Sequence, residues 1–205
     1  DGTYNTSSGT ATLTVNQRTI TVTAVTDTKV YDGNTTSAGV PTITAGSLAA
    51  GDTVTWTQTF NNANVGVGKT LTPAGTVSDG NGGNNYTVTF VTDTTGVITA
   101  HALTITADAG QSKTYGNADP VFTYQITTGA LVGGDSLSGA LSRVAGENVG
   151  NYAITQGTLT AGANYTITFV SNNFTITARA ITVTAVTDTK VYDGNTTSAG
   201  VPTIT

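Results

Sequence analysis

The sequence predicts an all-β fold of tandem Ig-like antiparallel β-sandwich modules arranged as an extended rod. Threonine makes up roughly a quarter of the chain, with much Val and Ile, and β-branched residues favour pleated, half-buried surfaces over helices. Short segments with period-two alternation are separated by turns rich in Gly, Asn and Asp. One string of 25 residues also occurs twice, at 20–44 and at 181–205, an offset of 161 positions. Identity over this length indicates a repeat array.

The predicted strands follow one another with the same two-faced pattern. In residues 53–60 every odd position is Thr, whereas Val54, Trp56, Gln58 and Phe60 occupy the other face, so we expect Trp56 in a core. The same alternation of apolar residues with Thr marks residues 20–24, 86–90, 103–107 and 165–169. Turn signals lie at residues 32–34, 79–83, 116–117 and 133–135.

Two unlike modules alternate along the chain. Residues 85–91 align with 164–170, residues 29–34 with 113–117, and residues 46–52 with 129–135. We therefore expect the C-terminal strands of a preceding module at 1–18, complete modules at 19–100 and 101–179, and the N-terminal part of a third at 180–205. No Pro-rich or Gly-Ser spacer separates them, which favours a stiff rod.

Composition disfavours several classes of function. Only 9% of residues are charged and the net charge is −5, so too few cations are present to bind a nucleic acid. The chain has no Cys and no Met, which is compatible with secretion but does not establish it. No apolar run approaches the roughly 18 residues that span a bilayer. We expect any export signal or anchor to lie outside these residues.

Several motifs resemble known bacterial repeat domains. The segment KVYDGN, at 29–34 and 190–195, resembles the signature of the YDG domain, and KTYGNADP at 113–120, GALVGGD at 129–135 and NYTI at 164–167 resemble an MBG domain of the YGX type. The resemblance implies tandem repeats of a very large bacterial surface protein, such as a filamentous-haemagglutinin-like adhesin, and supplies no catalytic residue. The structural motif residues are Lys29, Tyr31, Asp32, Gly33, Asn34, Asp52, Lys113, Tyr115, Gly116, Asn117 and Asp135.

We expect no enzyme. His101 is the only histidine, and it occupies the junction position that Arg18 and Arg179 hold elsewhere in this chain. No Ser-His-Asp or Cys-His set can be assembled without it. The Asp residues lie mostly in turns, where bonding to nearby backbone amides accounts for them.

A bound ion is a weaker alternative. Asp79 and Asn81 in one loop, and Asp27 and Asp32 in another, could offer oxygens to calcium. Neither loop matches the calcium-binding pattern D-x-[DN]-x-[DN]-G-x5-E, because the terminal Glu is missing. The competing interpretation is a plain Asn/Gly turn, and no other cofactor is expected.

An internal cross-link is a second alternative. Lys29 or Lys113 on an early strand could reach Asn85 or Asn164 on a late one. The acid activating the amide would be Asp52, Asp135 or Glu147.

The sequence therefore predicts a structural or adhesive segment of a giant extracellular protein, acting as a stiff stalk or multivalent fibre. A self-associating filament or biofilm-matrix subunit is the alternative, and a glycan- or mucin-binding module a third. The expected partners are neighbouring repeats, other copies, or host and biofilm glycans, with no nucleic acid.

Overall fold

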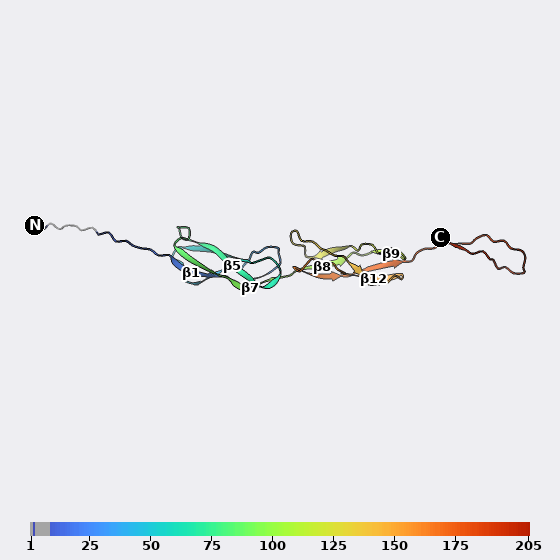
Figure 1. Cartoon of the computed structure of the whole chain (residues 1–205), viewed down its shortest axis with the longest axis horizontal. Coiled ribbons are helices and arrows are strands. Elements are labelled where there is room, and N and C mark those ends of the chain that lie inside the picture. Colours follow the sequence, from blue (N-terminus) through green and yellow to red (C-terminus); the bar gives the residue numbers. More distant parts are fainter. Residues whose placement is uncertain (1, 3–8) are drawn as a thin grey trace. The chain divides into compact units, whose positions relative to one another are not determined.

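The computed structural model describes Gly2 and residues 9–205 (Figure 1). The described residues form strands, turns and irregular segments but no helix. Accordingly, no helix in this part of the chain is long and apolar enough to cross a bilayer. The all-β prediction is confirmed.

The chain forms two compact units. The first comprises Asp1–Ala102 with the short segments Leu131–Asp135 and Gly162–Thr166. The second comprises Leu103–Ala130, Ser136–Ala161 and Ile167–Thr205.

Two sheets build the first half of the chain. One has the order β3-β1-β6, from strands Thr42–Ala45, Arg18–Thr23 and Tyr86–Val91. The other has the order β2-β7-β5-β4, from Thr28–Val30, Asp93–Thr99, Gly66–Ser78 and Thr53–Phe60.

The second half of the chain repeats this strand order. One sheet has the order β10-β8-β13, from Tyr124–Thr128, His101–Ala107 and Tyr165–Val170. The other has the order β11-β12-β14-β9, from Ser142–Arg143, Gly150–Thr155, Asn173–Thr177 and Ser112–Thr114. The last two strands, β15 (Val183–Thr184) and β16 (Thr203–Ile204), pair only with each other.

The pairing is not antiparallel throughout, and this corrects the predicted sandwich. Strand β1 runs parallel to β6 over six residues, β2 runs parallel to β7, and β9 runs parallel to β14. In each case the first strands of a module pair with its last strands, far along the chain. Only antiparallel neighbours can be joined by a tight hairpin, and a long intervening segment permits the parallel arrangement.

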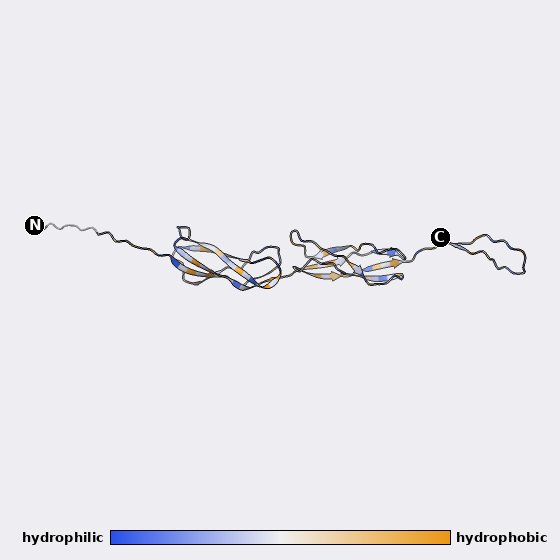
Figure 2. Cartoon of the chain, viewed as in Figure 1, coloured by the Kyte–Doolittle hydropathy of each residue, from blue (hydrophilic) through white to orange (hydrophobic). Residues whose placement is uncertain are grey.

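The core of the first half confirms the alternation. Trp56 and Phe60 are buried on one face of β4, whereas the odd-numbered threonines face solvent. Trp56 is 7% exposed and clusters with Ile20 and Val22 of the other sheet. Gly75 lies opposite Trp56, and a Cβ there would come within 2.6 Å of the indole ring. Figure 2 shows this mixture of apolar and polar residues along the strands.

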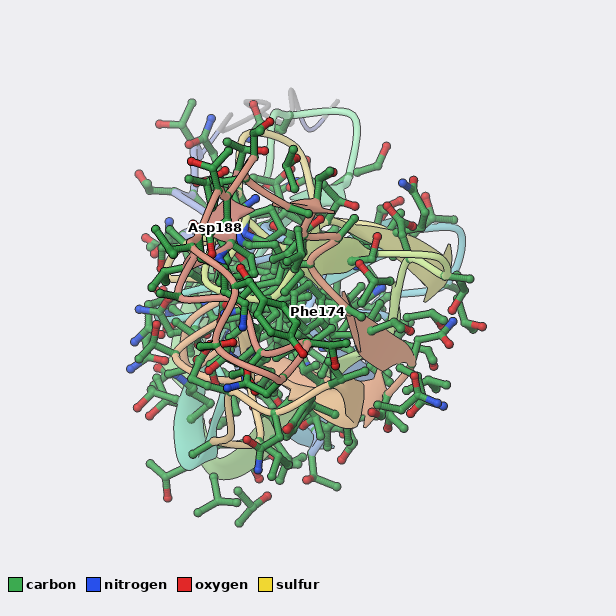
Figure 3. The ribbon with its side chains drawn as sticks, turned by 90° about the vertical axis from the view of Figure 1, so that its right-hand side faces the viewer. Phe174 and Asp188 are labelled. Atoms are coloured by element: carbon green, nitrogen blue, oxygen red, sulfur yellow. The ribbon has the colours of Figure 1, made fainter. Side chains whose placement is uncertain are left out.

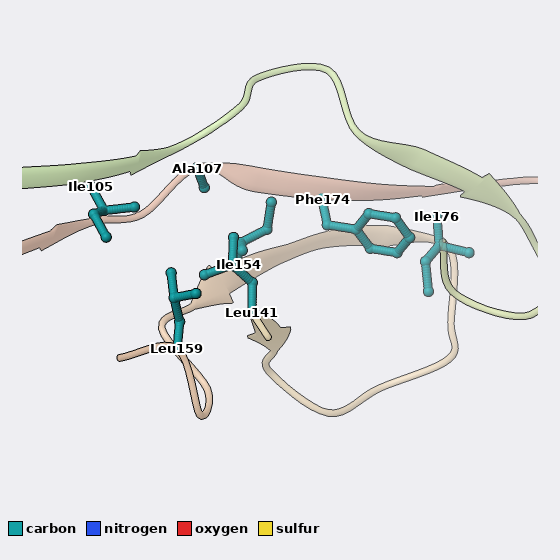
Figure 4. Packing of buried hydrophobic residues seen from close by; sticks show 7 residues of the cluster. All are labelled: Ile105, Ala107, Leu141, Ile154, Leu159, Phe174 and Ile176. Atoms are coloured by element: carbon teal, nitrogen blue, oxygen red, sulfur yellow. The ribbon is translucent and has the colours of Figure 1, made fainter. Parts of the chain in front are cut away.

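The second core gathers around Phe174, which is labelled in Figures 3 and 4. Figure 4 shows Phe174 beside Ile176 on one strand, with Leu141 and Ile154 close together nearby. The complete buried cluster is Ile105, Ala107, Leu141, Ile154, Leu159, Phe174 and Ile176. Ile105 and Ala107 come from one sheet and Ile154, Phe174 and Ile176 from the other, whereas Leu141 and Leu159 lie outside the strands.

The two ends of the chain behave differently from the complete modules. Residues 9–17 form no strand, so the strands expected at 1–18 are absent up to Gln17 in the described residues. Asp1 and residues 3–8, which belonged to that prediction, lie outside the described residues. Backbone hydrogen bonds define a strand, and residues 9–17 have no partner strand. Residues 181–205 form only the β15–β16 hairpin, and nearly all their side chains are exposed.

Candidate functional site

The YDGN loop is organised around the partly buried ammonium group of Lys29. Lys29 Nζ lies 2.7 Å from Asp32 Oδ1, 2.8 Å from the carbonyl oxygen of Asn34 and 3.0 Å from Asn34 Oδ1. The amide of Asn34 donates to Asp32 Oδ1 at 3.1 Å, and Gly33 has a φ of 78°. The motif therefore forms a turn that closes on its own lysine, and Gly supplies the positive φ that the turn requires.

A second carboxylate closes the neighbouring turn. Asp27 Oδ2 accepts hydrogen bonds from Ser37 Oγ at 2.5 Å and from the amide of Ala38 at 2.9 Å. Desolvation raises the pKa of Asp27, but these hydrogen bonds outweigh it, so the pKa lies below its ordinary value. The carboxylate thus stays charged and holds the loop.

Both turns recur in residues 181–205. Lys190 Nζ lies 2.9 Å from Asp193 Oδ1 and 2.7 Å from Asn195 Oδ1. Asp188, labelled in Figure 3, accepts from Ser198 Oγ at 2.6 Å and from the amide of Ala199 at 2.8 Å. The side-chain contacts of the first loop therefore recur in the β15–β16 hairpin.

Junction residues bind the motif tyrosines through the backbone. Arg179 Nε donates to the carbonyl oxygen of Tyr115 at 2.9 Å, and Arg179 Nη2 donates to Asn117 Oδ1 at 2.7 Å. His101 Nδ1 lies 3.2 Å from the carbonyl oxygen of Tyr31, which can only accept. Histidine and arginine thus play the same role at the two junctions.

Backbone hydrogen bonds also hold the two motif tyrosines, Tyr31 and Tyr115, in place. The amides of Tyr31 and Tyr115 donate to the carbonyl oxygens of Thr99 and Thr177, both at 2.8 Å. Gly116 adopts a φ of 86° in the second turn. The Tyr31 side chain is buried, and that of Tyr115 is exposed.

Each module also carries a tyrosine–aspartate clamp. Tyr86 Oη donates to Asp52 Oδ2 at 2.5 Å and accepts from the amide of Ala49 at 2.7 Å. Tyr165 Oη donates to Asp135 Oδ2 at 2.6 Å and accepts from the amide of Val132 at 2.8 Å. In the first module the clamp joins the loop before β4 to the start of β6. In the second module it joins residues 129–135 to the start of β13.

Backbone amides of the Asp79 loop donate hydrogen bonds to both carboxylate oxygens of Asp79. Asp79 Oδ1 accepts from the amides of Asn81 and Gly83, both at 2.8 Å, and Oδ2 accepts from the amide of Asn85 at 3.0 Å. The hydrogen bond from Gly83 is the largest cause that lowers the pKa of Asp79. These contacts explain the run of Asp, Gly and Asn as an Asx-type turn.

A network of four charges is the most concentrated polar site in the second half of the chain. Lys113 Nζ lies 2.6 Å from Asp119 Oδ1 and 2.5 Å from Glu147 Oε2. Arg143 Nε lies 2.6 Å from Asp119 Oδ2, and Arg143 Nη2 lies 2.6 Å from Glu147 Oε1. The two cations are buried, with side chains 4% and 6% exposed, and Arg143 lies 5.3 Å from the centre of the Phe174 ring.

The electrostatics of this network favour fixed charges over proton transfer. Hydrogen bonds that Lys113 donates to Asp119 and Glu147 raise the pKa of Lys113 above its ordinary value. Arg143 lowers the pKa of Asp119, and Lys113 lowers that of Glu147. A general base or nucleophile at neutral pH needs shifts of the opposite sign. The network therefore favours the charged form of all four groups.

The contacts of these loops bear on both alternatives, the bound ion and the internal cross-link. In the described residues no three His, Cys, Asp or Glu side chains converge to hold a metal ion. The oxygens of Asp32 and Asn34 instead face the Lys29 ammonium. In the described residues, Lys29 and Lys113 direct their amines to these local oxygens and to Asp119 and Glu147, and not to Asn85 or Asn164. Of the contacts that the cross-link would need, the one between Lys113 and Glu147 is present.

Sequence reasoning missed three polar residues that the structure makes central. Gln58 is buried, and it bonds the amide and the carbonyl of Val25 at 2.9 and 2.7 Å. Gln58 lies on the same face of its strand as the apolar residues Trp56 and Phe60, so the sequence pattern could have predicted its burial. Asp119 and Arg143 carry no such signal, because only tertiary pairing brings them to Lys113.

Comparison with known proteins agrees with the motifs. Residues 16–96 match the family model of the YDG domain, and residues 103–175 match that of the MBG domain (YGX type). No curated protein and no solved structure matched the chain.

Proposed function

Because the chain belongs to the proteins that carry a YDG domain followed by an MBG domain of the YGX type, we propose that it is a structural, adhesive repeat segment of a giant extracellular bacterial protein. It acts as a stiff stalk or a multivalent fibre at the cell surface. The observation that carries the proposal is the exact return of the first module's opening residues after 161 positions. Arrays of this kind extend a chain or multiply weak contacts.

The finer architecture we propose is a rod of Ig-like sandwiches. Support comes from the two buried clusters, each drawn from two sheets, and from the single residue, Ala100, that separates β7 from β8. A linker this short leaves little room for independent motion.

We also propose that the segment has no catalytic role and needs no cofactor. Its only histidine is engaged with a backbone carbonyl, the buried amine of Lys113 is paired with carboxylates, and that of Lys69 donates to the side-chain oxygen of Asn62. The polar residues of the motifs are thereby accounted for as loop closures.

Electron microscopy of the native material tests the stalk. Long thin fibres with an axial repeat of two modules are the expected result, and discrete compact particles would contradict it. Recombinant chains with one and two 161-residue periods provide the matched comparison, since each added period should add the same length.

Self-association into a filament is the second candidate. Dilution distinguishes the two: a fibre made of one chain keeps its length, whereas a polymer shortens. Binding of the chain on a glycan array would instead favour a glycan- or mucin-binding module.

A further inference from the structure

The first compact unit includes two short segments of the second domain. The family model of the MBG domain covers residues 103–175. Nevertheless, Leu131–Asp135 and Gly162–Thr166 belong to the same compact unit as the residues up to Ala102. Contacts between these two segments and the YDG domain therefore lie inside one compact unit.

The carboxylate of Asp135 accepts hydrogen bonds from two tyrosines. Tyr165 Oη lies 2.6 Å and Tyr31 Oη lies 3.0 Å from the same oxygen, Asp135 Oδ2. The two phenol rings meet edge to face with their centroids 5.5 Å apart, an arrangement that aromatic quadrupoles favour. The hydrogen bond to Asp135 is the largest cause that raises the pKa of Tyr31 above its ordinary value. Tyr31 therefore remains a donor at neutral pH.

Asn164 makes a second set of contacts with the YDG domain. Its Oδ1 accepts from the amide of Val65 at 3.0 Å, and its Nδ2 donates to Asn64 Oδ1 at 3.2 Å. Asn64 and Val65 lie in the loop between β4 and β5. A second loop of the YDG domain thus reaches the same two segments.

Gly33 approaches these segments too closely to carry a side chain. A Cβ on Gly33 would come within 2.8 Å of Val132 Cγ1, so a side chain there would displace Val132. Glycine is therefore required twice at this position, for the close approach and for the φ of 78°. Lys29, Asp32 and Asn34 close the turn itself, as described above.

We propose that the Tyr-Asp-Gly motif of the YDG domain is a docking site for the MBG domain that follows it. Tyr31 and Gly33 are its recognition residues, and Asp135 is the acceptor on the partner. The carboxylate that closes the clamp of the MBG domain thereby also receives the phenol of the preceding domain. This pairing is the same whether the array works as a stalk or as a filament.

Selectivity follows from the cost of a mismatch. The Tyr31 side chain is 8% exposed. A following domain with an apolar residue in place of Asp135 would leave the Tyr31 hydroxyl without its acceptor. Leaving a buried donor unsatisfied costs the full desolvation of that group, which disfavours the wrong partner.

Hydrogen exchange at the Val65 amide of the full chain tests the docking. This amide donates to Asn164, so it is protected while the segments are docked. Tyr31→Phe keeps the ring but removes the hydrogen bond to Asp135, and Asp135→Asn removes the charge. Each variant should raise the exchange rate of Val65 about tenfold or more, as expected for losing a hydrogen bond to a charged group.

The matched control is Asp52→Asn, because Asp52 closes the clamp of the YDG domain with Tyr86. It should leave Val65 at the parent rate. Trp56 emission reports the first core and should stay unchanged in the two test variants. A parent rate at Val65 in both test variants, an equal rise in the control, or a shift of Trp56 emission together with the rise would overturn the proposal. Neither adhesion nor fibre length is measured, so a failure here is distinct from a failure of the proposed function.

Discussion

Residues 20–44 and 181–205 share one sequence but not one structure. In both, a lysine closes the YDGN turn and an Asp accepts from the Ser and Ala ten and eleven residues later. Gly33 and Gly194 have φ values of 78° and 79°. In the first copy, however, three strands are built into two sheets, whereas the second forms a bare two-stranded hairpin.

The difference separates local from long-range determinants. Turns arise from side chains that reach their own backbone within a few residues. Membership of a sheet and burial of an apolar face require strands from elsewhere in the chain, here β4 to β7. A single two-stranded hairpin is marginal in water for this reason.

The largest expected contrast is between Ile20→Ala and Ile181→Ala. Ile20→Ala should lower the free energy of unfolding of the first unit by about 2–5 kcal/mol, because it leaves a cavity in the core. Ile181→Ala should change stability by less than about 0.5 kcal/mol, because that side chain is exposed. Urea unfolding followed by Trp56 emission and by far-ultraviolet circular dichroism measures both. Equal costs would mean that the hairpin is covered in solution.

A smaller effect is expected at Gln58, which bonds Val25 in the first copy. Gln58→Leu should cost about 1–3 kcal/mol, because the buried amide and carbonyl of Val25 lose their partner. Hydrogen exchange gives the sharper measurement: the Val25 amide should exchange slowly in the parent chain and approach the rate of its equivalent, Val186, in the variant. Thr57→Val, on the exposed face of the same strand, is the control and should leave the Val25 rate unchanged.

The smallest effect is expected from pH, and it should be the same in both copies. The pKa of Asp188 is lowered chiefly by Ser198, and that of Asp27 is lowered by Ser37 despite desolvation. A depressed pKa stabilises the folded turn above the ordinary value of 3.8, and this contribution is lost as the pH falls through the folded pKa.

Titration of the side-chain carboxyl carbons by NMR should place both values below 3.8. Ser37→Ala and Ser198→Ala should each move the matching value upward. A normal value for Asp188 beside a low one for Asp27 would show that the turn needs the surrounding module.

Much of the fold followed from period and repetition. The phase of residues 53–60 placed Trp56 and Phe60 inside and the threonines outside, as observed. The alignment of 46–52 with 129–135 and of 85–91 with 164–170 anticipated that these segments are equivalent, and the tyrosine–aspartate clamps explain why both carry the same markers. The parallel strand pairs were not foreseen, because alternation describes the two faces of a strand and carries no information about its neighbours.

By itself, the sequence determined the all-β class, the two-module period and the turns that close on their own side chains, since these depend on residues close together in the chain. Only the tertiary structure decided which strands pair in parallel, that Lys113 meets Asp119 and Glu147, and that one copy of an identical segment is buried while the other is exposed. Burial and pairing depend on distant residues, and an identical string of residues has no burial of its own until other strands cover it.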